Sequence, residues 1–139
     1  RKLELRPTDH LLEIGSGWGG LALHAAQRFG CRVTTTTLSR EQWRLTRERV
    51  VAANLGDRVE VLCVDYRDLT GTYDKLVSIE MIEAIGHQYY DTYFARCSEL
   101  LAPHGIGFRD LGRRGLGRSV HRKTLVGHVA LNVARSSGG

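Results

Sequence analysis

A cluster of glycines follows a short apolar segment near the start of the chain, in the stretch LLEIGSGWGG at residues 11–20. Gly15, Gly17 and Gly20 fit the pattern G-x-G-x-x-G between an expected strand and an expected helix. Glycines permit a tight turn and let a ligand lie against the backbone, and the N–H groups that begin a helix favour negative charge. The pattern predicts a loop that holds a nucleotide-containing ligand, and a purely structural glycine turn also fits it.

The residues around this loop help to distinguish dinucleotides from other ligands. A dinucleotide site usually has an acid about 20 residues after the glycines, where it binds a ribose hydroxyl. Residues 35–39 read TTTLS and contain no acid. Glu13, however, stands two residues before the first glycine and gives the pattern E-x-G-x-G-x-G. This arrangement resembles motif I of S-adenosylmethionine-dependent methyltransferases, in which the loop holds the amino-acid part of the cofactor.

Strand-like and helix-like segments alternate along the body of the chain. Runs of apolar or β-branched residues predict strands, and apolar residues at helical spacing predict helices between them. The expected strands are residues 11–14, 32–37, 59–65, 75–79 and 105–108, and the expected helices are residues 18–29, 39–54 and 90–101, the last ended by Pro103. This alternation predicts an α/β fold with a mainly parallel sheet, whose ligand lies beyond the carboxyl ends of the strands.

Several further motifs resemble a single family. The segments LEIGSGWGGLALHAA, TLSREQ, VDYRDLTGTYDKLVSIEMIEAIGHQYYDTYF and LLAPHG are similar, in order and spacing, to the cyclopropane-fatty-acyl-phospholipid synthases and their mycolic-acid relatives. The resemblance runs from about Leu3 to Ile106. It implies a Rossmann-like methyltransferase core, which we expect to be truncated at both ends. It also implies transfer of a methyl or methylene group from S-adenosylmethionine to the cis double bond of a lipid acyl chain.

The same resemblance implies roles for individual residues. The implied cofactor-binding residues are Glu13 in the glycine motif, Gly15 and Gly17 at the methionine portion, Thr37, Leu38 and Gln42 near the ribose, and Asp65 and Tyr66 beside the adenine. Glu83 corresponds to the catalytic glutamate that helps to hold a bicarbonate ion, the base of the reaction.

The residues by themselves leave structural roles open for three of these side chains. In its structural role, Gln42 would complete a helix cap begun by Ser39. Asp65 would be an ordinary turn residue at a strand end. Glu83 would be a solvated carboxylate, with Glu80 as the competing candidate for its catalytic role. The six histidines show no metal-ligand spacing. We therefore expect no metal site.

The positive charge of the chain is concentrated near its end. The net charge is +5, and residues 106–139 contain seven Lys or Arg against one acid. This segment lacks the interleaved aromatic residues typical of nucleic-acid binding, so we expect no nucleic-acid partner. We divide the chain into an incomplete cofactor-binding core at residues 1–106 and a basic, Gly- and Arg-rich tail at residues 107–139, which is atypical of the fold and which we expect to be disordered.

Composition and resemblance together indicate a cellular setting. The three cysteines are far apart and form no C-x-x-C pair, which is typical of a reducing cytoplasm. Because the implied substrate is an unsaturated phospholipid or fatty-acyl chain, we expect a cytoplasmic protein, peripheral to the inner membrane surface. Two alternatives stay open: a related methyltransferase acting on an amine or another small acceptor, and a non-catalytic fragment that at most binds the cofactor.

Overall fold

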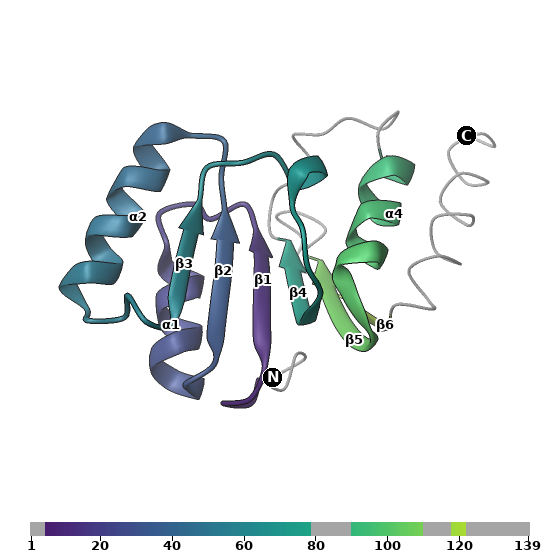
Figure 1. Ribbon diagram of the computed structural model, residues 1–139, viewed down its shortest axis with the longest axis horizontal. Coiled ribbons are helices and arrows are strands. Elements are labelled where there is room, and N and C mark those ends of the chain that lie inside the picture. The colour runs from purple at the N-terminus through teal and green to yellow at the C-terminus, as the bar shows by residue number, and fades with distance from the viewer. Residues whose placement is uncertain (1–4, 79–89, 110–117, 122–139) are drawn as a thin grey trace.

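The computed structural model describes residues 5–78, 90–109 and 118–121. Figure 1 labels the elements in these ranges, whose order is β1 (His10–Ile14), α1 (Gly20–Phe29), β2 (Arg32–Thr36), α2 (Arg40–Ala52), β3 (Val59–Leu62), the 3₁₀ helix η1 (Tyr66–Asp68), β4 (Tyr73–Ser78), α4 (Tyr90–Leu100), β5 (Leu101–Arg109) and β6 (Arg118–His121).

The six strands form one sheet in the order β3-β2-β1-β4-β5-β6. The first five strands are parallel, and β6 pairs with β5 in the antiparallel direction. The carboxyl ends of β1, β2 and β3 point toward the same edge of the sheet (Figure 1). The predicted α/β fold with a mainly parallel sheet is confirmed.

Strand β1 lies inside the sheet and contributes side chains to two separate apolar layers. Leu11 packs with residues of α1 and α2, whereas Leu12 and Ile14 pack with residues of η1 and α4. Because successive strand residues point to opposite faces, a strand covered on both faces needs apolar residues without alternation. The run LLEI meets this need, with Glu13 as its one polar position.

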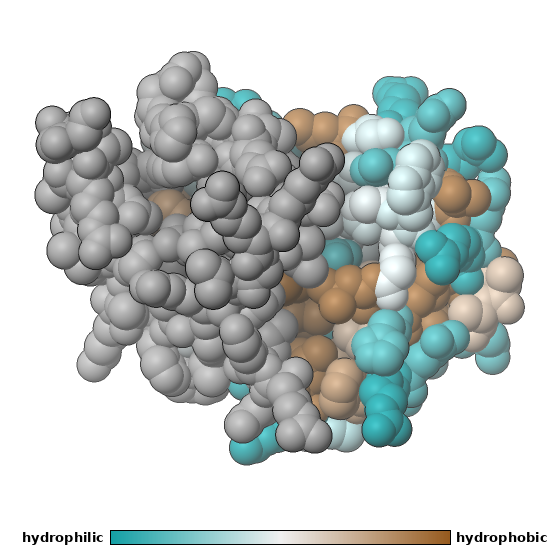
Figure 2. Space-filling view, turned by 180° about the vertical axis from the view of Figure 1, so that it is seen from behind, coloured by the Kyte–Doolittle hydropathy of each residue, from teal (hydrophilic) through white to brown (hydrophobic). Residues whose placement is uncertain are grey.

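Exposed hydrophobic and hydrophilic residues are also unevenly distributed over the surface of the molecule. In the view from behind, hydrophobic residues occupy the middle of the visible coloured surface and hydrophilic residues its outer margin (Figure 2). Three large hydrophobic side chains are nevertheless exposed in the described part of the chain: Trp18, Leu38 and Val51. The first two lie in the loops that follow β1 and β2, and they bear on the site described below.

Two helix boundaries follow from local sequence signals. Gly30 ends α1 in the left-handed conformation (φ 70°) and donates its N–H to the carbonyl of Ala26, which is the usual role of glycine at this position. Ser39 begins α2, because its hydroxyl accepts the N–H of Gln42. The helix ends at Ala52, two residues before the predicted boundary.

The sequence prediction was wrong about Pro103. Helix α4 ends at Leu100, and Leu101 already begins β5, so Pro103 lies inside a strand. The pairing with β4 shifts here, from Tyr73 opposite Leu101 to Lys75 opposite Ile106. Proline has no N–H for a regular ladder, and a strand tolerates it where the pairing is irregular.

The described residues beyond position 106 belong to strands. Strand β5 continues to Arg109, and β6 pairs with its second half from residues 118–121. The strand-like segment at residues 124–131 and the rest of the tail lie outside the described residues. No helix within the described ranges has the length and apolar character to cross a membrane.

Candidate cofactor-binding site

The glycine loop wraps around the carboxyl ends of β1 and β2. The backbone N–H groups of Gly15 and Ser16 both donate to the carbonyl of Thr36, at 2.9 and 3.0 Å. Gly15, Gly17 and Gly19 all have positive φ angles, of 91°, 51° and 89°. Non-glycine residues rarely adopt these angles. The sequence LLEIGSGWGG therefore forms the tight turn that its glycines predict.

Two glycines of this loop have different surroundings. A Cβ atom added at Gly17 would meet nothing within 4 Å, so this side of the loop is open. A Cβ atom added at Gly19 would lie 2.8 Å from Cγ2 of Thr46 on α2. Gly17 leaves room for a ligand, whereas Gly19 allows α2 to approach the loop. The packing role of Gly19 is not apparent from the motif, since Thr46 is distant in sequence.

The loop leads directly into the amino-terminal end of α1. Gly19 precedes the helix and has no side chain to cap it, and the first turn contains no acid. The N–H groups at the start of a helix lack partners within the helix, and together they favour a negatively charged group. This end of α1 is suited to an anionic group such as a carboxylate.

A second group of predicted residues lies between β2 and α2. The hydroxyl of Thr37 donates to Oε1 of Gln42 at 3.0 Å and accepts the backbone N–H of Ser39 at 3.1 Å. In a full capping box, the Gln42 side chain would bind that N–H itself. Thr37 takes its place, so the backbone N–H of Gln42 completes the cap of Ser39 while its side chain orients Thr37. Leu38, between them, is 61% exposed.

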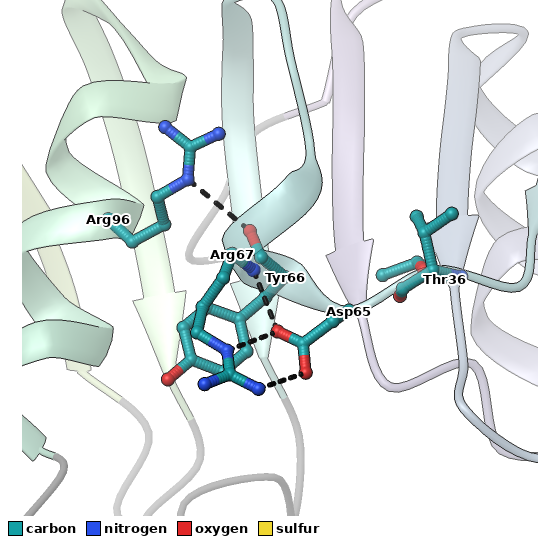
Figure 3. Close-up of polar contacts among 6 residues, drawn as sticks. Thr36, Asp65, Tyr66, Arg67 and Arg96 are labelled. Atoms are coloured by element: carbon teal, nitrogen blue, oxygen red, sulfur yellow. Dashed lines mark hydrogen bonds and ion pairs between the residues drawn. The ribbon is translucent and has the colours of Figure 1, made fainter.

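Asp65 lies at the end of the segment that follows β3, where Figure 3 shows its carboxylate directed at Arg67. Oδ1 accepts the backbone N–H and Nε–H of Arg67, each at 2.9 Å, and Oδ2 accepts Nη2–H at 3.0 Å. The hydrogen bonds from Arg67 lower the pKa of Asp65. Asp65 thus begins η1 in the turn role that we considered, and its contact with an adenine stays a prediction.

Tyr66 directs its ring into the apolar core. The ring packs edge-on against Tyr93, with the centroids 5.0 Å apart, and its side chain is buried. Its backbone carbonyl accepts a hydrogen bond from Nε of Arg96 on α4 at 3.4 Å (Figure 3). Both the ring and the carbonyl of Tyr66 therefore hold α4 in place. A position of Tyr66 beside an adenine stays a prediction.

Contacts between strand ends bring the three predicted segments to one edge. The hydroxyl of Thr36 donates to the carbonyl of Val64 at 2.6 Å, and the backbone N–H of Thr37 donates to the carbonyl of Leu62 at 3.1 Å. The chain that leads to Asp65 is thereby held against the end of β2. Since the end of β2 also holds the glycine loop, all three segments share this edge of the sheet.

Glu13 is buried beneath the loop. Its Oε1 accepts the hydroxyl of Thr35, the residue opposite it on β2, at 2.6 Å. Burial raises the pKa of Glu13 from its ordinary value of 4.5 to about 7, although the Thr35 hydrogen bond opposes this rise. A direct contact of Glu13 with a ligand stays a prediction, as does the role of Glu83, which lies outside the described residues. Among the described residues, no three His, Cys, Asp or Glu side chains are grouped to hold a metal ion.

Comparison with known families decides how this site is interpreted. The sequence model of the mycolic acid cyclopropane synthetase family matches residues 1–111, most of the chain. The chain belongs to this family. The resemblance seen in the sequence motifs is therefore confirmed, and the glycine loop, the Thr37–Gln42 segment and Asp65 all lie in the part of the chain that matches the family.

Curated relatives of the mycolic acid cyclopropane synthetase family show how much of a whole protein the chain represents. Tuberculostearic acid methyltransferase UfaA1 of Mycobacterium tuberculosis is 52% identical over 97 residues, which cover 70% of the chain and 22% of the relative. Cyclopropane-fatty-acyl-phospholipid synthase of Escherichia coli is 42% identical over 105 residues, which cover 76% of the chain and 26% of the relative. The chain thus spans about a quarter of the length of these relatives.

Solved structures share the same arrangement. Mycolic acid cyclopropane synthase CmaA1, complexed with SAH and CTAB, is 30% identical with a TM-score of 0.74, and the likeness covers 78% of this chain and 38% of that one. Coclaurine N-methyltransferase, bound to N-methylheliamine and SAH, is 31% identical with a TM-score of 0.71, over 78% of this chain and 32% of that one.

Proposed function

We propose that the chain forms the S-adenosylmethionine-binding core of a methyltransferase that acts on the cis double bond of a lipid acyl chain. The observation that carries this proposal is the open space beside Gly17, at the edge of the sheet where the predicted segments meet. The two curated relatives described above are by name a tuberculostearic acid methyltransferase and a cyclopropane-fatty-acyl-phospholipid synthase. Both names support a lipid acceptor.

The residues present fit this cofactor. The open backbone at Gly17 and the uncapped start of α1 suit its amino-acid portion, whose carboxylate is negative. Gly15 and Gly17 would hold this portion, Thr37, Leu38 and Gln42 the ribose, and Asp65 and Tyr66 the adenine. A threonine instead of an acid at the end of β2 favours this cofactor over a dinucleotide.

When bound, the cofactor supplies an electrophilic methyl group. An alkene is a weak nucleophile, so the main task of the chain is to orient the reactants and exclude water. The exposed side chains of Trp18 and Leu38 provide apolar surface next to the loops that would hold the cofactor. We further propose that Glu83 helps to hold a bicarbonate ion, which takes up the proton released from the substrate. Proton removal from the methylated cation would close a cyclopropane, whereas capture of the same cation by water, with release of a proton, would give a methyl-branched lipid alcohol.

A lipid substrate also implies a location. We propose that the whole protein works in the cytoplasm, at the inner membrane surface, where unsaturated phospholipids are accessible. The partner is then a phospholipid or fatty-acyl chain rather than a nucleic acid.

A binding experiment tests the cofactor assignment. Calorimetry of the chain with S-adenosylhomocysteine and with NAD should show binding of the first and not of the second. Gly17→Val should abolish binding, because the side chain fills the open space. Gly71→Val is the matched control, since Gly71 also has a positive φ, of 91°, and an added Cβ there meets only the Tyr73 hydroxyl, at 4.0 Å, in the turn before β4.

A second variant keeps this test independent of folding. Gly17→Asn fills the same space, and asparagine tolerates the left-handed backbone better than valine does. Circular dichroism should show that it folds. Unchanged affinity of a folded Gly17→Asn chain, or preference of the wild-type chain for NAD, would contradict the assignment.

A small-molecule acceptor is the second candidate function. It is favoured by the likeness to coclaurine N-methyltransferase, which matches the chain about as well as CmaA1 does. Incubation with S-adenosylmethionine and either unsaturated phospholipid or a cyclic amine, followed by mass spectrometry, distinguishes the two. A lipid that gains one methylene unit supports the lipid proposal, and a methylated amine supports the alternative.

A further inference from the structure

One side of α2 contacts both loops of the proposed cofactor site. Gln42, Thr46 and Arg49 stand at positions i, i+4 and i+7 of this helix, so they lie on the same face. We call these three residues the α2 stripe. The stripe faces the loop after β2 at one end and the glycine loop further along.

Each member of the stripe has its own contact. Gln42 accepts a hydrogen bond from Thr37, in the loop after β2, at 3.0 Å. Thr46 is fully buried against Gly19, and its methyl group is the atom that an added Cβ at Gly19 would strike. Nη1 of Arg49 donates to the carbonyl of Trp18, between the two glycines Gly17 and Gly19.

Arg49 is the member of the stripe that holds the glycine loop by a polar contact. It lines a groove between α1 and α2 together with Gly20. The acid next to it, Glu48, is paired with Arg44 at 3.0 Å. The position of the Arg49 guanidinium is therefore explained by the loop carbonyl and not by that neighbouring acid.

We propose that the α2 stripe fixes the two cofactor loops relative to each other, with Arg49 as a positioning residue that holds the glycine loop in its binding shape. This inference rests on the proposed cofactor function. Unrestrained glycines have many accessible conformations. A ligand that must order such a loop loses binding free energy, so it binds more weakly than it would to a loop already held in shape. A helix of 13 residues, about 20 Å long, is rigid enough to link both loops.

The test compares Arg49→Met with Arg44→Met, the matched loss of an arginine on the same helix. Calorimetry with S-adenosylhomocysteine should show about tenfold weaker binding for Arg49→Met, the loss of about 1.4 kcal/mol, and unchanged binding for Arg44→Met. Arg49→Lys, which keeps a cationic donor, should restore most of the affinity. Hydrogen exchange at residues 15–20 of the ligand-free chain should be faster in Arg49→Met only.

The outcomes separate this inference from the function on which it rests. If the wild-type chain does not bind S-adenosylhomocysteine, the proposed function fails, and hydrogen exchange at residues 15–20 still tests the positioning role of Arg49. If the wild-type chain binds and Arg49→Met binds equally well with unchanged exchange, the positioning role is refuted. Should Arg49→Met fail to fold, Arg49→Ala, which also lacks a donor to the Trp18 carbonyl, takes its place in the same comparison.

Discussion

The buried carboxyl of Glu13 predicts an unusual dependence of stability on pH. Its pKa rises from 4.5 to about 7 because burial disfavours the charged form. Well below pH 4.5 the group is protonated in both the folded and the unfolded chain and has no effect on stability. As the pH rises further, the unfolded chain releases the proton first, so stability falls until the pH exceeds the folded pKa of about 7.

The size of this effect follows from the two pKa values. At about 1.4 kcal/mol per pH unit, the full loss of unfolding free energy is about 3 kcal/mol. Most of this loss falls between pH 5 and pH 8, because the unfolded chain is already partly ionised at pH 5. Glu13→Gln removes the charge and leaves an oxygen that still accepts the Thr35 hydroxyl.

Urea unfolding, followed by circular dichroism at pH 5 and pH 8, measures this effect. The advantage of Glu13→Gln over the wild-type chain should grow by about 2–3 kcal/mol between the two pH values. Thr35→Val removes the hydrogen bond that lowers the pKa of Glu13. The pKa should therefore rise further, and the loss of unfolding free energy between pH 5 and pH 8 should be larger than in the wild-type chain. A difference between Glu13→Gln and wild type that does not vary with pH would refute the reasoning.

Two further predictions concern the packing of α2. Gly19→Ala should lower the unfolding free energy by about 1–3 kcal/mol, because alanine is strained at a φ of 89° and its Cβ would lie 2.8 Å from Thr46. Gly17→Ala, also at a positive φ but in open space, is the control, and equal stability of the two variants in urea unfolding would contradict the packing role. Trp43→Phe should cost about 1 kcal/mol, because the indole N–H that donates to the Val61 carbonyl at 3.0 Å is lost; an unchanged thermal midpoint would show that this bond adds nothing to stability.

Much of the fold is predictable because its signals are local. The apolar runs, the helical spacing and the caps at Ser39 and Gly30 act over a few residues, and the structure confirms them. Pro103 shows the limit of local signals. Whether a proline ends a helix or falls in a strand depends on the pairing with β4, which residues 101–109 do not encode by themselves.

The sequence by itself determined that Gly15 and Gly17 form a tight loop after β1, and that three strand ends carry the polar residues of a candidate site. Only the tertiary structure decided what those residues contact. The ring of Tyr66 packs against Tyr93, and its carbonyl accepts a hydrogen bond from Arg96 on α4.

The same division applies beneath the loop. Glu13 meets Thr35 only because β1 and β2 pair in one register, and Thr46 meets Gly19 only because α2 crosses the loop at that point. Contacts between residues far apart in the chain depend on how strands pair and helices pack. A motif fixes the backbone that it spans, but the energies of its side chains are set by neighbours that the motif does not contain.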